Sequence, residues 1–564
     1  MGISILSSSA VFPLMTTVDA DLKGPDRETG ENIARSLWMH EYTPEALPPE
    51  IRARISDQKN FGSAFGERIR ARITDLRDAP ESFNPDYTKR YAELFRYAGD
   101  LTPHQAYAMS NLFGMDSARG YQELPTDKKF TFPEDDRPQF EYQVGWHFFV
   151  GNVFDTKGRE YGVQLMFWRY SLLPPEMAKE AGLTDIENQI VEIHFAVSAA
   201  GERHYRMRPV VVAGTTGLIN FSTGPYTYSV GKQTLQSQSK DALFPLRLQA
   251  WGIDNHKDVL AEISIDITIN QTKGYVLNGD EGLMPSVGGV GTLYYSVPRL
   301  LVDPEKSRLS IDGEELQLAS GTFWYDHQWG TGFMPAGSPR SDVLRAAGII
   351  DDKPAVGWDW MEVQFDNDTE LTLASIHSKE QKDFINQSGP TPPGVMTAPA
   401  VGSFIKENGE YFPIKAMLKV TEWVKSSVTD GPYLTTRVWY PNRMEVTVET
   451  AEVPDACKQF VMIPIVSTGQ QGFFAAGAEY SEGAVSIEWP KGKRIGSGFL
   501  ENVSYADACR QNLRLAGIPD TPEMAGIFAK PVITDEMKAA AMVFLMKPEN
   551  AARLAAELAK ARGL

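Results

Sequence analysis

The sequence predicts a mainly β protein with two antiparallel barrel units and helical segments at both ends. Three observations lead to this prediction. From about residue 141 to about residue 505, short runs rich in aromatic and β-branched residues are separated by Gly, Asn and Asp turns. Within many of these runs apolar and polar residues alternate, as in strands that bury one face. About 365 residues of this kind exceed what one small barrel needs, so we expect two.

The first segment, residues 1–135, is expected to be helical. Between residues 27 and 118 apolar residues recur at steps of three and four, which is the period of an amphipathic helix. The clearest helix start is at Leu101-Thr102-Pro103-His104, because threonine is a good N-cap and proline fits the first turn. The β region is already complete without these helices, so we expect them to form either a lid over a pocket or the interface of a homodimer.

The β region is divided into a first barrel over residues 136–315 and a second over residues 316–505. A turn-rich stretch that runs from Ser310 to Gly321 is expected near the joint. The strand signal is clearest in residues 145–155, 161–173, 190–199, 244–254, 260–270, 291–303, 357–367, 370–378, 436–450 and 483–493.

Helical character returns in residues 506–564. Residues 535–546 have a strong helical composition, and Lys547-Pro548 ends that run before a last amphipathic helix. The Ala- and Met-rich stretch 538–546 is apolar on most faces, and we expect it to pack on the β body.

Composition and charge exclude several classes of protein. The 564 residues include 55 Lys+Arg and 73 Asp+Glu, and the net charge of −18 argues against a nucleic-acid-binding surface. No run approaches the roughly 18 apolar residues of a membrane-spanning helix. No Lys or Arg precedes Lys23, so the charged start of a signal peptide is missing and we expect a cytoplasmic protein, with a periplasmic location left open.

The densest group of chemically active side chains lies in residues 321–330, GTFWYDHQWG. In a strand, Tyr325, His327 and Trp329 share one face, whereas Trp324 and Asp326 share the other. An Asp and His framed by aromatic rings are suited to proton transfer, because burial shifts the pKa of such groups. The alternative is structural: Asp326 makes turn or inter-barrel hydrogen bonds and the rings fill the core.

Two further aromatic runs and two isolated histidines add candidates. In residues 357–362, Trp358, Trp360 and Glu362 share a face, so Glu362 lies either in solvent at a strand end or in a ligand site. In residues 145–149, Trp146 and His147 face opposite sides, and a structural role for His147 is an alternative to a catalytic one. Two more histidines in alternating strands, His194 and His377, are candidates to face a pocket.

Motifs for metal or nucleotide binding are missing from the sequence. The eight histidines show no HxH or HExxH spacing and the two cysteines form no CxxC pair, so no metal site is expected. No P-loop, nucleophile elbow or dinucleotide-binding glycine motif followed by a helix occurs, so we expect no organic cofactor.

Several segments in order resemble one known family, the AttH and carotenoid 1,2-hydratase (hydroxyneurosporene synthase) group of double lipocalin-like proteins. The resemblance rests on the Tyr-Tyr-Ser segment that contains Tyr294, the Trp-x-Asp-x-x-Trp-Gly segment from Trp324 to Gly330, and the Gly-Trp-Asp-Trp segment at residues 357–360. It covers about residues 140–505. It implies two packed lipocalin-like barrels with an apolar ligand pocket between or within them.

The resemblance also implies a chemistry, because members of this group include hydratases of isoprenoid double bonds and cyclases that fold polyenes. We therefore expect a cofactor-independent lyase (hydratase or dehydratase) or isomerase that acts on a small hydrophobic isoprenoid substrate, such as a terpenoid or a carotenoid-like compound. An acid would protonate the alkene, aromatic faces would stabilise the cation and a water would add. The alternatives are a carrier of a lipid or terpenoid without catalysis, and a pericyclase that shapes a polyene.

The expected roles follow from residue chemistry. Asp326 is the expected proton donor or acceptor, with His327 as a relay and Tyr325 as a hydrogen-bond donor. Strict alternation puts Asp326 and His327 on opposite faces, so their joint action requires a bulge or a cavity at the strand end. The expected substrate-binding residues are Trp146, His147, His194, Tyr294, Trp324, Trp329, Trp358, Trp360, Glu362 and His377.

Overall fold

The computed structural model describes residues 121–505, except for several internal segments. The gaps are residues 123, 126, 172–174, 181–183, 208–209, 215–217, 255–260, 286–290, 332–356, 378, 386, 427–437 and 476–477. Short helical segments are η2 (Glu134–Asp136), α7 (Pro175–Glu180), η4 (Pro304–Lys306), η5 (Lys379–Phe384) and α9 (Asp455–Lys458).

The first barrel contains the described strands from residue 144 to residue 331. Their main order is β4-β3-β2-β1-β15-β13-β10-β9-β8-β7-β6, and an antiparallel bridge between Met207, which follows β4, and Asp254 of β9 closes the ring. The bounds are β1 (Val144–Asp155), β2 (Glu160–Ser171), β3 (Gln189–Ala199), β4 (His204–Arg206), β5 (Val210–Ala213), β6 (Ile219–Thr223), β7 (Tyr226–Val230), β8 (Gln233–Ser237), β9 (Leu246–Asp254), β10 (Ala261–Gln271), β11 (Val276–Leu277), β12 (Leu283–Pro285), β13 (Gly291–Val302), β14 (Arg308–Ile311) and β15 (Glu314–Thr331).

The second barrel contains the described strands from residue 358 to residue 503. Their order is β21-β20-β19-β18-β17-β16-β24-β23-β22, and pairing of β21 with β23 closes the ring. The bounds are β16 (Trp358–Phe365), β17 (Glu370–Ile376), β18 (Met396–Ile405), β19 (Tyr411–Lys425), β20 (Trp439–Val448), β21 (Gln459–Pro464), β22 (Gln471–Ala475), β23 (Ala478–Glu488) and β24 (Arg494–Val503). The predicted fold class, mainly β with two closed antiparallel barrels, is confirmed. The predicted terminal helices lie outside the described residues.

One sheet assignment differs from the sequence-based division at residue 316. Strand β15 pairs with β1 and β13, so the run 321–330 belongs to the first barrel. The predicted turn is present, with Asp312 and Gly313 at φ of 51° and 81°, but it joins β14 to β15 within one sheet. Gly321 does not end the strand, because its missing side chain allows Val153 of β1 to approach closely.

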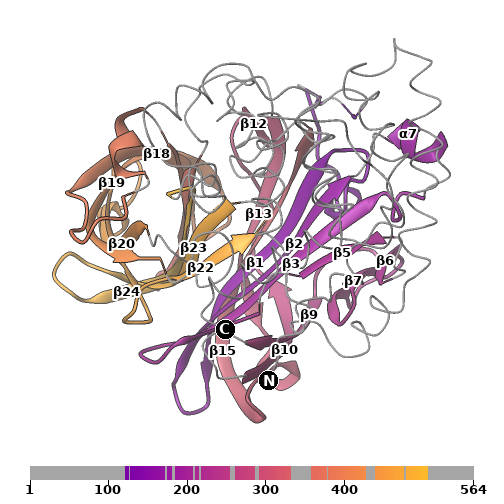
Figure 1. Cartoon of the computed structure of the whole chain (residues 1–564), viewed down its shortest axis with the longest axis horizontal. Coiled ribbons are helices and arrows are strands. Elements are labelled where there is room, and N and C mark those ends of the chain that lie inside the picture. Colours follow the sequence, from indigo (N-terminus) through magenta and orange to yellow (C-terminus); the bar gives the residue numbers. More distant parts are fainter. Residues whose placement is uncertain are drawn as a thin grey trace, which may run out of the picture.

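Strands β1 and β2 form the wall that the two barrels share. Nearly every position of both strands is buried, in contrast to β19, where buried and exposed positions alternate along most of the strand. A strand whose side chains are buried on both faces must have another layer of protein packed against each face. Here one face lines the interior of the first barrel and the other contacts β23 and β24 of the second, as the neighbouring purple and yellow ribbons in Figure 1 show.

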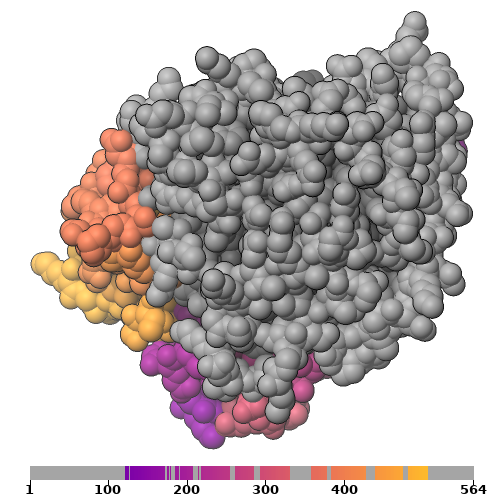
Figure 2. Space-filling view, viewed as in Figure 1, coloured from indigo at the N-terminus to yellow at the C-terminus, as the bar shows by residue number. Residues whose placement is uncertain are grey.

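Close backbone approach and buried charges hold the barrels together. A Cβ atom added to Gly162 of β2 would lie 2.4 Å from Cβ of Ala484 of β23, so only glycine fits there. At one flank the Lys273 ammonium and the Arg299 guanidinium of the first barrel both donate to the buried Glu370 carboxylate of the second. In the view of Figure 2, the described surface shows the second barrel (orange to yellow) at the left edge and the first barrel (purple and pink) at the lower edge.

None of the helices in the described part of the chain combines the length and apolarity needed to cross a membrane.

Candidate functional site between the barrels

The pairing of β15 with β1 decides which predicted residues meet. The register is continuous, with His147 opposite His327, Phe148 opposite Asp326 and Phe149 opposite Tyr325, and no bulge interrupts it between residues 320 and 330. Side chains of adjacent residues in a strand point to opposite faces. Asp326 therefore faces the second barrel, whereas His327 and Tyr325 line the interior of the first.

Asp326 sits in a cage of donors from its own barrel. One carboxylate oxygen accepts hydrogen bonds from the Trp324 indole at 2.6 Å and from the Ser296 hydroxyl, and the other accepts one from the Tyr294 hydroxyl at 2.6 Å. Burial raises the pKa of Asp326 to about 7, although the three hydrogen bonds oppose that rise. The result is a carboxyl group that exchanges its proton near neutral pH while its position is fixed.

The second barrel completes this cage from β16. The Trp360 indole donates to the Tyr294 hydroxyl at 3.1 Å, and its ring meets Phe148 edge-on at a centroid distance of 5.5 Å. Two residues further along the same face, Glu362 is fully buried, and neither of its carboxyl oxygens makes a close hydrogen bond within the described part of the chain. Burial, reinforced by the charge of Asp326, raises the pKa of Glu362 well above its usual range and so favours the protonated acid.

A second polar cluster lies on the same outer faces, between β3, β23 and β24. Glu482 and Glu501 are directly opposite each other in the β23–β24 ladder; Glu482 is fully buried and Glu501 is partly buried. Burial and their mutual repulsion raise the pKa of Glu482 well above its usual range, and burial raises that of Glu501 to about 7. Because two negative charges on directly opposite residues repel each other, the pair holds at least one proton at neutral pH.

Other groups connect this cluster to the first barrel. His194 lies between Glu192, at 3.1 Å from its Nε2 atom, and the Tyr480 hydroxyl, at 2.5 Å from its Nδ1 atom. Gln164 of β2 donates to the same Tyr480 hydroxyl at 3.2 Å. The site therefore carries ionisable side chains from both barrels.

Tryptophan rings supply the apolar part of the site. Trp146 and Trp168 stack at 4.7 Å with their planes 9° apart, and the Trp358 indole donates to Glu501 at 2.6 Å. Large aromatic faces next to acids with raised pKa values suit a hydrophobic substrate that becomes positively charged during a reaction.

The structure divides the predicted residues among three places. The inter-barrel site contains Asp326, Trp146, His194, Tyr294, Trp324, Trp358, Trp360 and Glu362. Tyr325, His327, His147 and Trp329 lie inside the first barrel.

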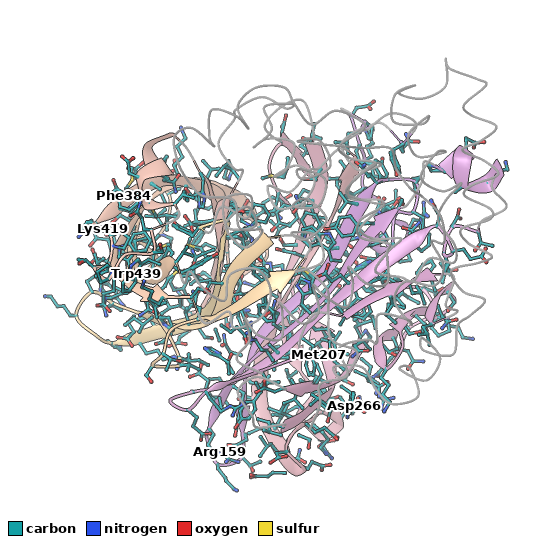
Figure 3. All side chains as sticks on the ribbon, in the orientation of Figure 1. Arg159, Met207, Asp266, Phe384, Lys419 and Trp439 are labelled. Carbon is teal, nitrogen blue, oxygen red and sulfur yellow. The ribbon has the colours of Figure 1, made fainter. Side chains whose placement is uncertain are left out.

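The remaining predicted residue, His377, lies at one end of the second barrel. Its ring contacts Tyr505 at 4.9 Å, and Tyr505 in turn contacts Trp423, on which Phe384 of η5 stacks at 5.7 Å. Figure 3 marks Phe384 on the second barrel. His377 is thus part of the packing at that end and does not contribute to the inter-barrel site.

Sequence reasoning missed four polar residues of the site: Glu482, Glu501, Glu192 and Tyr480. The pattern held one usable signal, because Glu192 and His194 are two residues apart in a strand and share a face. Among the described residues, no three His, Cys, Asp or Glu side chains gather in a way that would hold a metal ion.

Comparison with known proteins identifies the family. The model of the AttH-like family matches residues 123–505, about two-thirds of the chain. A search of curated proteins gave no match.

A search of solved structures gave matches at low sequence identity. An AttH protein from Nitrosomonas europaea is 17% identical over 68% of this chain and 99% of its own, with a TM-score of 0.47. Kievitone hydratase from Nectria haematococca is 14% identical over 69% and 97%, with a TM-score of 0.42. CghA, solved with Sch210972, is 9% identical over 70% and 98%, with a TM-score of 0.35. On the extent of the family match, this chain belongs to the AttH-like family.

Proposed function

We propose that this protein is a cofactor-independent hydratase, dehydratase or isomerase that acts on a carbon–carbon double bond of a hydrophobic, isoprenoid-like substrate held between the two barrels. One observation carries the proposal: Asp326 is fully buried, is caged by three donors, and has a pKa raised to about 7 by burial. A general acid works best when its pKa lies near the working pH.

The reaction needs only a proton, a water and an apolar site. Protonated Asp326 gives its proton to one alkene carbon, and the positive charge develops on the other. The faces of Trp324 and Trp360 stabilise that charge by cation–π attraction. Water adds to the cation, and the extra proton of the added water returns to Asp326. Dehydration is the reverse, and loss of a proton from a different carbon gives an isomer.

Tyr294 positions the acid. Its hydroxyl donates to Asp326 and accepts from Trp360, so it links the acid on the first barrel to an aromatic wall on the second. Glu362, a buried acid with a raised pKa on the same face as Trp360, is the expected partner that orients the water.

The density of acids favours an enzyme over a carrier of terpenoids. A carrier binds an apolar ligand best without burying ionisable groups, because each one costs desolvation energy. Here Asp326, Glu362 and Glu482 are buried and Glu501 is partly buried, and all four have raised pKa values. A pericyclase, which works by shape, has no need for any of them.

The test is to incubate the full chain with acyclic terpene alcohols and linear polyenes in heavy-oxygen water and to follow the products by mass spectrometry. A product that gains one labelled water, or an alcohol that loses water, supports the proposal. We expect Asp326→Asn to lower kcat by about 10²- to 10⁴-fold. We also expect kcat/KM of the hydration to fall above pH 7, where the acid loses its proton.

Two tyrosines provide a matched control. Tyr294→Phe and Tyr325→Phe delete the same hydroxyl from neighbouring strands, but only Tyr294 contacts Asp326. We expect Tyr294→Phe to slow the reaction and Tyr325→Phe to leave it within about twofold. An Asp326→Asn variant with full activity, or equal losses in the two tyrosine variants, would exclude the inter-barrel acid.

A further inference from the structure

The interior of the first barrel holds a polar cluster of its own. Strands β1 and β15 separate this cluster from the inter-barrel site. The rings of His147 and His327 stack at 4.0 Å. The Nδ1 atom of His147 lies 2.7 Å from the Tyr325 hydroxyl, and that of His327 lies 3.2 Å from the Tyr295 hydroxyl. Tyr295 in turn donates to Asp136 at 2.6 Å.

The segment before β1 closes this end of the barrel. Asp136 of η2 has no exposed surface, and its second carboxylate oxygen accepts from Tyr275 at 3.1 Å. Phe132 stacks on Tyr275 at 3.4 Å, and Phe130 contacts Trp329 at 5.8 Å. The polar cluster is thus covered by a segment that is anchored by two tyrosines.

Four buried polar atoms around the histidine pair have no hydrogen-bond partner among the residues that the structure describes: Nε2 of His147, the hydroxyls of Tyr226 and Tyr228, and Nε1 of Trp329. All four side chains are at most 6% exposed. They belong to one neighbourhood, because the Tyr228 and Tyr226 rings lie 5.5 and 6.5 Å from His147, and the Trp329 ring lies 4.5 Å from His327. Buried polar groups are almost always paired, so four unpaired ones together indicate a missing partner.

The charges of the cluster define that partner. Burial lowers the pKa of His147 to about 3 and that of His327 well below its usual range, so both rings are neutral. The buried Arg169 guanidinium donates to the carbonyl oxygens of Gln139 and Tyr142 and to the Gln189 side chain. The four unpaired atoms themselves belong to uncharged side chains, so a neutral polar partner satisfies them without burying a further charge.

We propose that the first barrel is a second binding chamber for a small neutral aromatic or cyclic molecule that carries a hydroxyl or carbonyl oxygen. The indole of Trp329 only donates and the two tyrosine hydroxyls can donate, so an acceptor oxygen satisfies them. The rings of Phe167 and Tyr228, which lie 5.1 Å apart, form part of the apolar surroundings. This inference does not depend on the reaction between the barrels.

Phenol is the first probe, and benzene is the comparison that lacks the oxygen. Equilibrium dialysis and thermal unfolding of the full chain measure binding. We expect saturable binding of one phenol, weaker binding of benzene, and a roughly 3- to 10-fold weaker phenol affinity in Tyr228→Phe and Trp329→Phe, the loss expected for one hydrogen bond. Tyr294→Phe, which changes the inter-barrel site, serves as the control and should bind phenol normally.

A second readout separates a binding role from a purely structural one. Tyr228→Phe removes an unpaired hydroxyl, so without ligand its Tm should exceed that of the parent protein even though its phenol affinity falls. Three results overturn the proposal: no saturable phenol binding, phenol binding that Tyr294→Phe weakens and Tyr228→Phe does not, or an unchanged Tm in Tyr228→Phe, which means that internal water already satisfies the hydroxyl.

Discussion

Replacing Asp326 with asparagine should stabilise the protein at alkaline pH while it removes the proposed acid. The folded-state pKa of Asp326 is about 7 and its ordinary value is 3.8. Between these values the unfolded chain releases its proton and the folded chain keeps it. The protonated Asp326 therefore makes its full contribution to the free energy of unfolding below pH 3.8, and this contribution decreases as the pH rises toward 7.

The size of the effect follows from this window. From pH 5 to pH 7 is two pH units, and each is worth about 1.4 kcal/mol. The free energy of unfolding of the parent should thus fall by about 2–3 kcal/mol relative to Asp326→Asn between pH 5 and pH 8. Asparagine does not ionise, and its side-chain oxygen can still accept from Trp324 and Ser296, so the cage stays largely intact.

Urea unfolding of the two full-length proteins at pH 5 and pH 8 measures the difference. Most other titrating groups are common to both proteins and cancel in the comparison. Removal of the Asp326 charge also eases ionisation of Glu362 and Glu501, which shifts the result in the same direction. A stability difference that is the same at both pH values would refute the raised pKa and, with it, the basis for a neutral-pH acid.

Three other changes test the contacts that build the site. Glu370→Gln should lower the free energy of unfolding by about 3–5 kcal/mol, since it removes the carboxylate that Lys273 and Arg299 share and leaves the buried Lys273 ammonium without its ion pair, whereas Glu445→Gln in an exposed ion pair should change it by less than about 1 kcal/mol; chemical denaturation compares them. Gly162→Ala should cost about 1–3 kcal/mol through its clash with the second barrel, and Gly274→Ala, whose Cβ would meet no atom within 4 Å, should cost little; equal Tm values for the two would contradict the close approach. Glu482→Gln should raise the Tm more at pH 8 than at pH 5, and the opposite order would mean that Glu482 is charged in the folded protein.

The fold could be predicted because strand periodicity is a local property. The run 145–155 became β1 and the run 357–367 contains β16, as alternation and β-branched content indicated. The division between barrels is not local. The hairpin turn at Asp312-Gly313 has the same composition as a domain joint, and only the pairing of β15 with β1 tells the two apart.

The site could be predicted in part for the same reason. The tryptophans and Asp326 are recognisable as candidate site residues from their type and their place in aromatic strands. Glu482 and Glu501, by contrast, lie on the face of their strands that points away from the core of the second barrel. In a single barrel that face meets solvent, where a glutamate needs no explanation. Its burial becomes visible only when a second barrel covers the face.

Alternation also explains why the predicted trio of Asp326, His327 and Tyr325 divides into two clusters. A continuous strand in a shared wall must present consecutive residues to two different environments. The Asp326 face meets tryptophans and other acids, and the His327 face meets tyrosines and neutral imidazoles. The dense run 321–330 therefore serves two chambers, and a substitution at Asp326 and one at His327, although adjacent in sequence, should affect different ligands.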